Sequence, residues 1–231
     1  MADIYAHRGA SREYPENTIA AFRRAVELGV PGIELDVHLA ADGVPVVLHD
    51  ETVDRTTDRA GAVASFTSAE LGAMDAGGGQ GIPTLAEVIA LVEGRTRLNI
   101  EVKAAAAGDA VLAVVAEHPA LDWAISSFDW DVLRHIRRAS PEATLWPLSI
   151  AATEEAIALA QEIDATQLNL LDQAVDADIV RFLGDLGIES WIWTVNDPDR
   201  AAALVAWGAT GICTDDPALM VRQLGQPAEK G

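Results

Sequence analysis

Residues 189–214, ESWIWTVNDPDRAAALVAWGATGICT, contain a complete strand–helix–strand unit. The short runs at 189–195 and 210–214, rich in aromatic and β-branched residues, predict two strands. Between them lies an Ala-rich stretch whose apolar residues are spaced by three and four, which is typical of a helix. Gly208 follows that stretch, where a helix commonly ends. Strands and helices that alternate in this way predict a parallel sheet built from successive βα units.

The same unit recurs along the rest of the chain. Eight strand candidates alternate with about eight helical stretches in 231 residues, and this number predicts a (β/α)₈ TIM barrel. A doubly wound open sheet is the competing fold, because it uses the same alternation. The six further strand candidates are IYAH (4–7), GIELDV (32–37), RLNIEV (97–102), WAISS (123–127), TLWPLS (144–149) and TQLNLL (166–171).

One segment breaks the alternation. Residues 43–82, from GVPVVLHD to GGGQGI, carry an extra short strand followed by a long polar, Gly-rich stretch. A connection of this length in a compact domain is usually functional or disordered. We therefore predict a single TIM-barrel catalytic domain over residues 1–231, with a small insertion at about 43–82 after the second strand.

Composition argues against several classes of protein. The net charge of −20 argues against binding nucleic acid, which requires clustered Lys and Arg. The chain has no run of about 18 apolar residues that would span a membrane, and its start has no signal-peptide pattern. The lone Cys213 fits a reducing compartment, so we expect a cytoplasmic protein of undetermined oligomeric state. An anionic substrate would need a local positive site.

Polar residues gather at the carboxyl ends of the predicted strands, where barrel active sites are built. Side chains two residues apart on a strand share a face, so Glu34 lies beside Asp36, and Glu101 beside Lys103. Buried carboxylates need a partner or a metal. Three of them without clustered Cys or His favour an all-oxygen site for magnesium or calcium. The alternative is that all three simply pair with Arg8 and Lys103 inside the barrel.

Two histidines are candidates for proton transfer. His7 ends the first strand and His49 follows the apolar run VPVVL in the insertion. A single histidine in such a place is more often structural, but two beside a carboxylate site could act as general acid and general base. Arg8 and Lys103 would suit a phosphate group. Trp193 belongs either to the core or to an apolar wall of the substrate pocket.

Seven motifs, in this order and spacing, resemble the glycerophosphodiester phosphodiesterase family over about residues 5–217. Any one of them is weak evidence, but together they are specific. The motifs are AHRGASREYPENT (6–18), GIELDVHLAADGVPVVLHDETVDRTT (32–57), IPTLAEV (82–88), LNIEVK (98–103), SSFDWDVL (126–133), WTVND (193–197) and GICTDDP (211–217).

The resemblance implies a TIM barrel with an insertion after the second strand. It also implies hydrolysis of a small-molecule glycerophosphodiester to glycerol 3-phosphate and an alcohol, with one divalent cation, Mg²⁺ or Ca²⁺. Asn17 matches a family position near the site, with helix capping as the alternative. The implied roles are metal ligands for Glu34, Asp36 and Glu101, an acid–base pair for His7 and His49, phosphate contacts for Arg8 and Lys103, and a wall on the alcohol side for Trp193.

Two alternative functions remain open from the sequence. One is another phosphodiesterase or lyase on the same barrel, similar to lysophospholipase D or sphingomyelinase D, which would need an apolar surface to reach lipid. The other is a phosphate-binding protein without catalysis. The sequence also leaves open whether the nucleophile is water or the substrate's own 2-hydroxyl, and which histidine is the base.

Overall fold

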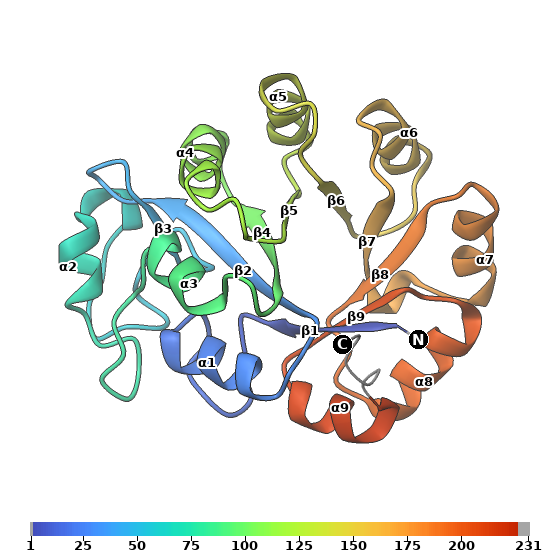
Figure 1. The fold of residues 1–231 in the computed structure, drawn as a ribbon, viewed down its shortest axis with the longest axis horizontal. Coiled ribbons are helices and arrows are strands. Elements are labelled where there is room, and N and C mark those ends of the chain that lie inside the picture. Colours follow the sequence, from blue (N-terminus) through green and yellow to red (C-terminus); the bar gives the residue numbers. More distant parts are fainter. Residues whose placement is uncertain (1, 226–231) are drawn as a thin grey trace.

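The computed structural model describes residues 2–225, and eight of their strands form a closed parallel barrel (Figure 1). The pairing of β1 with both β2 and β9 closes the ring, so the open-sheet alternative is wrong. All eight predicted strands are confirmed, with ends that differ by no more than two residues. They are β1 (Asp3–His7), β2 (Gly32–Leu39), β4 (Arg97–Val102), β5 (Trp123–Ser127), β6 (Leu145–Ser149), β7 (Gln167–Leu171), β8 (Glu189–Trp193) and β9 (Gly211–Thr214).

Helices surround the barrel and cover its outer face (Figure 1). In seven of the eight outer helices within residues 2–225, a Thr or Asp at the N-terminus accepts a hydrogen bond from the first turn. None of the described helices is long and apolar enough to cross a bilayer. The outer helices are α1 (Ile19–Glu27), α3 (Leu85–Val92), α4 (Ala105–Ala116), α5 (Trp130–Ala139), α6 (Glu154–Glu162), α7 (Ala177–Asp185), α8 (Pro198–Trp207) and α9 (Pro217–Leu224).

The insertion, residues 43–82, lies beyond β2 and contains the predicted extra strand, β3 (Pro45–Val47), which pairs antiparallel with β2. It also contains two short helical segments that its polar composition did not predict, η1 (Val63–Ser65) and α2 (Ser68–Gly72). A separate apolar cluster under these segments includes Val53, Leu71 and Met74. The insertion is therefore ordered by its own small core, and it projects from the barrel at the left of Figure 1.

Aromatic side chains fill the interior of the barrel on the side away from the carboxyl ends of the strands. The ring of Tyr5 packs edge-on against Trp191 at 5.2 Å and against Trp146 at 6.1 Å, and all three side chains are buried. Gly32 and Gly211 make room for these rings, since a Cβ atom at Gly32 would lie 2.1 Å from Tyr5. This packing fills one end of the barrel interior, so the pocket inside the barrel opens at the other end.

Adding a methyl group at Gly211 should destabilise the protein, because its Cβ atom would lie 1.7 Å from the Trp191 ring. Trp191 is 2% exposed and has little room to move. We expect Gly211→Ala to lower the free energy of unfolding by about 1–3 kcal/mol, the range for overpacking a core. Urea denaturation measures this loss.

Gly184→Ala is the matched control, since nothing lies within 4 Å of a Cβ atom at this position in α7. There the same change should stabilise by roughly 0.5–1 kcal/mol, because alanine is the better helix residue. Equal effects at the two glycines would contradict the packing argument.

Candidate active site

Three acidic side chains meet inside the barrel at the carboxyl ends of two adjacent strands. In the parallel register, Asp36 on β2 lies beside Glu101 on β4, and Glu34 is one step back on β2. Each residue offers a carboxylate oxygen that lies within 4.8 Å of the other two, and all three side chains are buried. Strand parity therefore predicted the grouping correctly.

Two cations contact this carboxylate cluster. Lys103 Nζ lies 2.6 Å from Glu101 Oε1 and 2.8 Å from Asp36 Oδ1. Arg8 Nε lies 3.3 Å from Asp36 Oδ2. The alternative in which the carboxylates simply pair with Arg8 and Lys103 thus describes the contacts of Asp36 and Glu101. Glu34, in contrast, has no Lys or Arg side chain within ion-pair distance among residues 2–225, and its Oε2 accepts a hydrogen bond from the backbone N–H of Arg8 at 3.1 Å.

Burial and mutual repulsion control the protonation of the cluster. Burial, followed by the charge of Asp36, raises the pKa of Glu34 to about 8 and that of Glu101 to about 7. Burial alone would also raise the pKa of Asp36, but Lys103 and Arg8 hold it well below its usual range. Buried carboxylate oxygens that repel one another form a donor set suited to a hard divalent cation. The residues present therefore fit such an ion.

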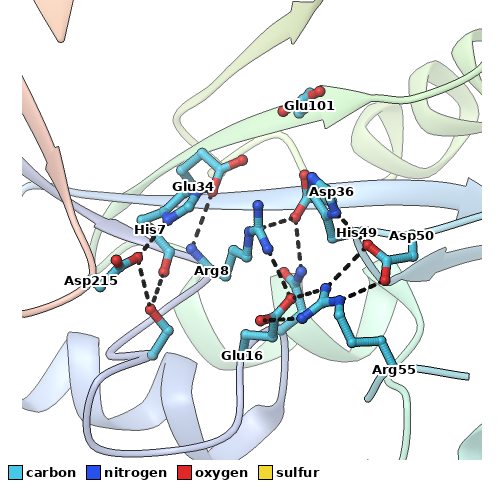
Figure 2. Close-up of polar contacts among 12 residues, drawn as sticks. His7, Arg8, Glu16, Glu34, Asp36, His49, Asp50, Arg55, Glu101 and Asp215 are labelled. Atoms are coloured by element: carbon cyan, nitrogen blue, oxygen red, sulfur yellow. Dashed lines mark hydrogen bonds and ion pairs between the residues drawn. The ribbon is translucent and has the colours of Figure 1, made fainter. Parts of the chain in front are cut away.

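Each of the two predicted histidines is held by an aspartate. Nδ1 of His7 lies 2.6 Å from Asp215 Oδ1, and Nδ1 of His49 lies 2.6 Å from Asp50 Oδ1 (Figure 2). Because an ionised carboxylate can only accept, each Nδ1 donates and each Nε2 is left available to a substrate. Asp215 also accepts hydrogen bonds from Ser11 and Asn196. Both imidazole rings are therefore fixed in one orientation.

The pKa values of the two histidines shift in opposite directions. Burial lowers the pKa of His7, but the hydrogen bond to Asp215 and the charge of Glu34 outweigh it, so the pKa is raised. Burial also lowers the pKa of His49, and the charge of Asp36 together with the Asp50 hydrogen bond only partly offsets it. The two rings thus differ in proton affinity although they line the same pocket.

A pocket of about 390 Å³ opens above the carboxylate cluster. Trp193 lines one wall and packs edge-on against Phe128 at 5.5 Å, and Phe128 is 46% exposed. The structure places both tryptophans along the pocket, with Trp193 packed against Phe128 and Trp191 buried against Tyr5 inside the barrel. The residues around the pocket are His7, Arg8, Glu34, His49, Asn99, Glu101, Lys103, Ser126, Phe128, Leu148, Trp191, Trp193 and Cys213.

The contacts of several supporting residues were not predicted from the sequence, although the resemblance had placed Asn17 near the site. Asn17 donates a hydrogen bond from Nδ2 to Asp36 Oδ2 at 2.8 Å, and Thr18 caps α1, so the capping alternative for Asn17 is wrong. His38 lies within β2, and its ring Nε2 is 3.0 Å from the backbone oxygen of His49. Asp50 directly follows His49 in the sequence, and this position was the one signal that could have predicted it as the partner of that histidine.

Comparison with known proteins gives consistent results over nearly the whole chain. A model of the Glycerophosphoryl diester phosphodiesterase family matches residues 7–219. A glycerophosphodiester phosphodiesterase from Caldanaerobacter subterraneus subsp. tengcongensis is 36% identical over 232 residues, which cover 94% of this chain and 96% of that protein.

Solved structures agree with the sequence comparison. A phosphodiesterase from Oleispira antarctica, in complex with the product sn-glycerol-3-phosphate, superposes with a TM-score of 0.93 at 28% identity, covering 98% of both chains. A glycerophosphodiester phosphodiesterase from Thermotoga maritima gives a TM-score of 0.83 at 31% identity, covering 96% of this chain and 98% of that one.

Proposed function

Because this chain belongs to the glycerophosphoryl diester phosphodiesterase family, we propose that it hydrolyses a glycerophosphodiester to glycerol 3-phosphate and an alcohol. The observation that carries the proposal is the single pocket in which two Asp-bound histidines face a buried carboxylate cluster with two cations. A phosphodiester needs this combination, since charge on the phosphoryl oxygens must be neutralised while protons move.

The carboxylate cluster is proposed to hold one divalent cation, Mg²⁺ or Ca²⁺. Glu34, Asp36 and Glu101 would be its ligands, and three carboxylates suffice for one ion rather than two. When bound, the cation supplies Lewis-acid stabilisation of charge on the phosphoryl oxygens. Asn17 holds Asp36 in place through its amide hydrogen bond.

Arg8 and Lys103 are proposed to contact the phosphate. Both side chains lie at the edge of the carboxylate cluster and line the pocket. The guanidinium group of Arg8 offers several donors in one plane, whereas Lys103 offers a compact charge. In a protein with a net charge of −20, these two residues supply the local positive charge that an anionic substrate requires.

His7 and His49 are proposed to transfer the protons. One Nε2 accepts the proton of the attacking hydroxyl, and the other donates a proton to the alcohol oxygen as its bond to phosphorus breaks. The attacking group is either water or the substrate's own 2-hydroxyl, in which case water then opens the resulting cyclic phosphate. Trp193 and Phe128 offer an apolar surface to the departing alcohol.

The test is to incubate the purified protein with glycerophosphocholine and either Mg²⁺ or Ca²⁺ and to measure glycerol 3-phosphate with a coupled dehydrogenase. We expect release of glycerol 3-phosphate and choline rather than phosphocholine. A parallel reaction with lysophosphatidylcholine tests the lipid-directed alternative, which would release choline and yield lysophosphatidic acid or its cyclic form. If phosphate esters bind without any turnover, the protein is a binding protein and the proposal fails.

A further inference from the structure

A network of charged side chains extends from the pocket into the insertion (Figure 2). At its centre Arg55 donates from Nε and Nη2 to the two oxygens of Asp50, at 2.6 and 3.1 Å. The same guanidinium donates from Nη1 and Nη2 to the two oxygens of Glu16, at 3.0 and 2.8 Å. Arg55 therefore bridges two carboxylates that would otherwise repel each other.

Each of these carboxylates also holds a residue of the pocket. Asp50 accepts from Nδ1 of His49 at 2.6 Å, and Glu16 accepts from Nη1 of Arg8 at 2.9 Å. Within residues 2–225, Arg55 is the only side chain that bonds to both acids. The guanidinium group of Arg55 thus links the insertion to the loop after β1, behind a histidine on one side and an arginine on the other.

We propose that Arg55 is a positioning residue that aligns His49 and Arg8 together, and so sets the insertion against the barrel in the arrangement needed for turnover. The inference rests on the roles proposed above for these two residues. Arg55 itself does not line the pocket, so it acts through Asp50 and Glu16.

The geometry requires arginine at this position. Four hydrogen bonds to two carboxylates match the planar fork of a guanidinium group, whereas a lysine would offer a single point of contact. Its hydrogen bonds to Glu16 and then Asp50 raise the pKa of Arg55, so it is charged wherever the enzyme is folded. Burial alone would raise the pKa of Glu16, but the hydrogen bonds and charges of Arg55 and Arg8 outweigh it and lower the pKa. Glu16 therefore stays ionised and accepts hydrogen bonds.

Because Arg55 is half exposed, its role in positioning can be tested apart from its contribution to folding stability. Its side chain is 48% exposed, so solvent screens its ion pairs, and losing them should cost less of the free energy of unfolding than losing a buried pair would. Loss of the guanidinium group should therefore loosen His49 and Arg8 without unfolding the protein. The expected signature is a large loss of activity with a much smaller change in the melting temperature.

The experiment compares Arg55→Gln, Arg55→Lys and Arg181→Gln in the full chain. Arg181 is the matched control because it is 68% exposed and, among the residues that the structure describes, pairs only with Asp178 on its own helix. We expect kcat/KM for glycerophosphocholine to fall about 10- to 100-fold in both Arg55 variants, the usual effect of losing an outer partner of a site residue. Arg181→Gln should match the unmodified protein.

Two single-arm variants divide the effect between its routes. Asp50→Asn weakens the hold on His49 and should lower kcat more than it changes KM. Glu16→Gln weakens the hold on Arg8 and should mainly raise KM. For Arg55→Ala, millimolar guanidinium chloride should restore part of the lost activity, because the half-exposed site can admit the ion, whereas sodium chloride at equal ionic strength should not.

The proposal is overturned if the Arg55 and Arg181 variants have equal kcat/KM, or if activity falls only in step with the melting temperature and guanidinium restores nothing. An unmodified protein that never releases glycerol 3-phosphate would instead refute the proposed function. In that case calorimetry with glycerol 3-phosphate still tests the Arg8 arm, since Arg55→Gln must weaken binding relative to Arg181→Gln. Equal binding would refute that arm.

Discussion

Replacing His7 or His49 with glutamine is expected to lower kcat about 10²- to 10⁴-fold, the range for loss of a general acid or base. Each ring is fixed through Nδ1 by an aspartate at 2.6 Å, so only Nε2 is available for proton transfer. Glutamine retains a polar group of similar reach but does not titrate near neutral pH. Steady-state kinetics with glycerophosphocholine measures the loss.

Measuring ligand binding should show whether the loss of kcat comes from lost proton transfer or from a distorted pocket. Both histidine variants should bind glycerol 3-phosphate nearly as well as the unmodified protein, because Arg8 and Lys103 are unchanged. His135→Gln is the matched control, since His135 is exposed on α5 and pairs with Asp109 at 2.7 Å, away from the pocket-lining residues. Full activity in either His7→Gln or His49→Gln would remove that residue from the proton-transfer scheme.

Removing divalent cations with EDTA is expected to abolish turnover, and added Mg²⁺ or Ca²⁺ should restore it. A divalent cation would neutralise the mutual repulsion of the three buried carboxylates, which together with burial raises the pKa values of Glu34 and Glu101. An ion that binds only the folded state must also raise the melting temperature. At an ion concentration of 100 times the dissociation constant, the free energy of unfolding rises by about 2.7 kcal/mol. Thermal shift assays therefore report binding without relying on activity.

Glu101→Gln tests the site itself. The amide retains an oxygen but loses a charge, so the variant should bind Mg²⁺ or Ca²⁺ more weakly. We expect the ion concentration that gives half of the thermal shift to rise at least tenfold, because loss of a residue that only supports a ligand already lowers metal affinity by about 10- to 100-fold. Glu117→Gln, an exposed position at the end of α4, is the matched control and should leave the shift unchanged. If EDTA-treated protein keeps its activity and shows no thermal shift, the metal proposal is wrong.

Local patterns were enough to predict the barrel and the carboxylate cluster. Side chains alternate along a strand with a period of two, so Glu34 and Asp36, and likewise Glu101 and Lys103, had to share the inner face. The packing of neighbouring parallel strands then brings Asp36 beside Glu101. These steps need only the order of strands in the sequence.

The rest depended on contacts between distant parts of the chain. His7 and its partner Asp215 are separated by 208 positions, and nothing near either residue identifies the other. Trp191 and Trp193 share a face, so parity could not show which of them is buried in the interior aromatic cluster. The helical segments of the insertion are ordered by a separate apolar cluster rather than by strong local propensity, and their polar sequence therefore read as a loop.

The contact between His7 and Asp215 joins the two ends of the barrel in the sequence. Within residues 2–225, β1 pairs with β9, and the histidine on β1 is oriented by an aspartate that immediately follows β9. A chain truncated before β9 therefore keeps both histidines and all three buried acidic residues, but it lacks the strand that closes the ring and the aspartate that orients His7. We expect such a truncated chain to be inactive even though every residue proposed for the chemistry is present.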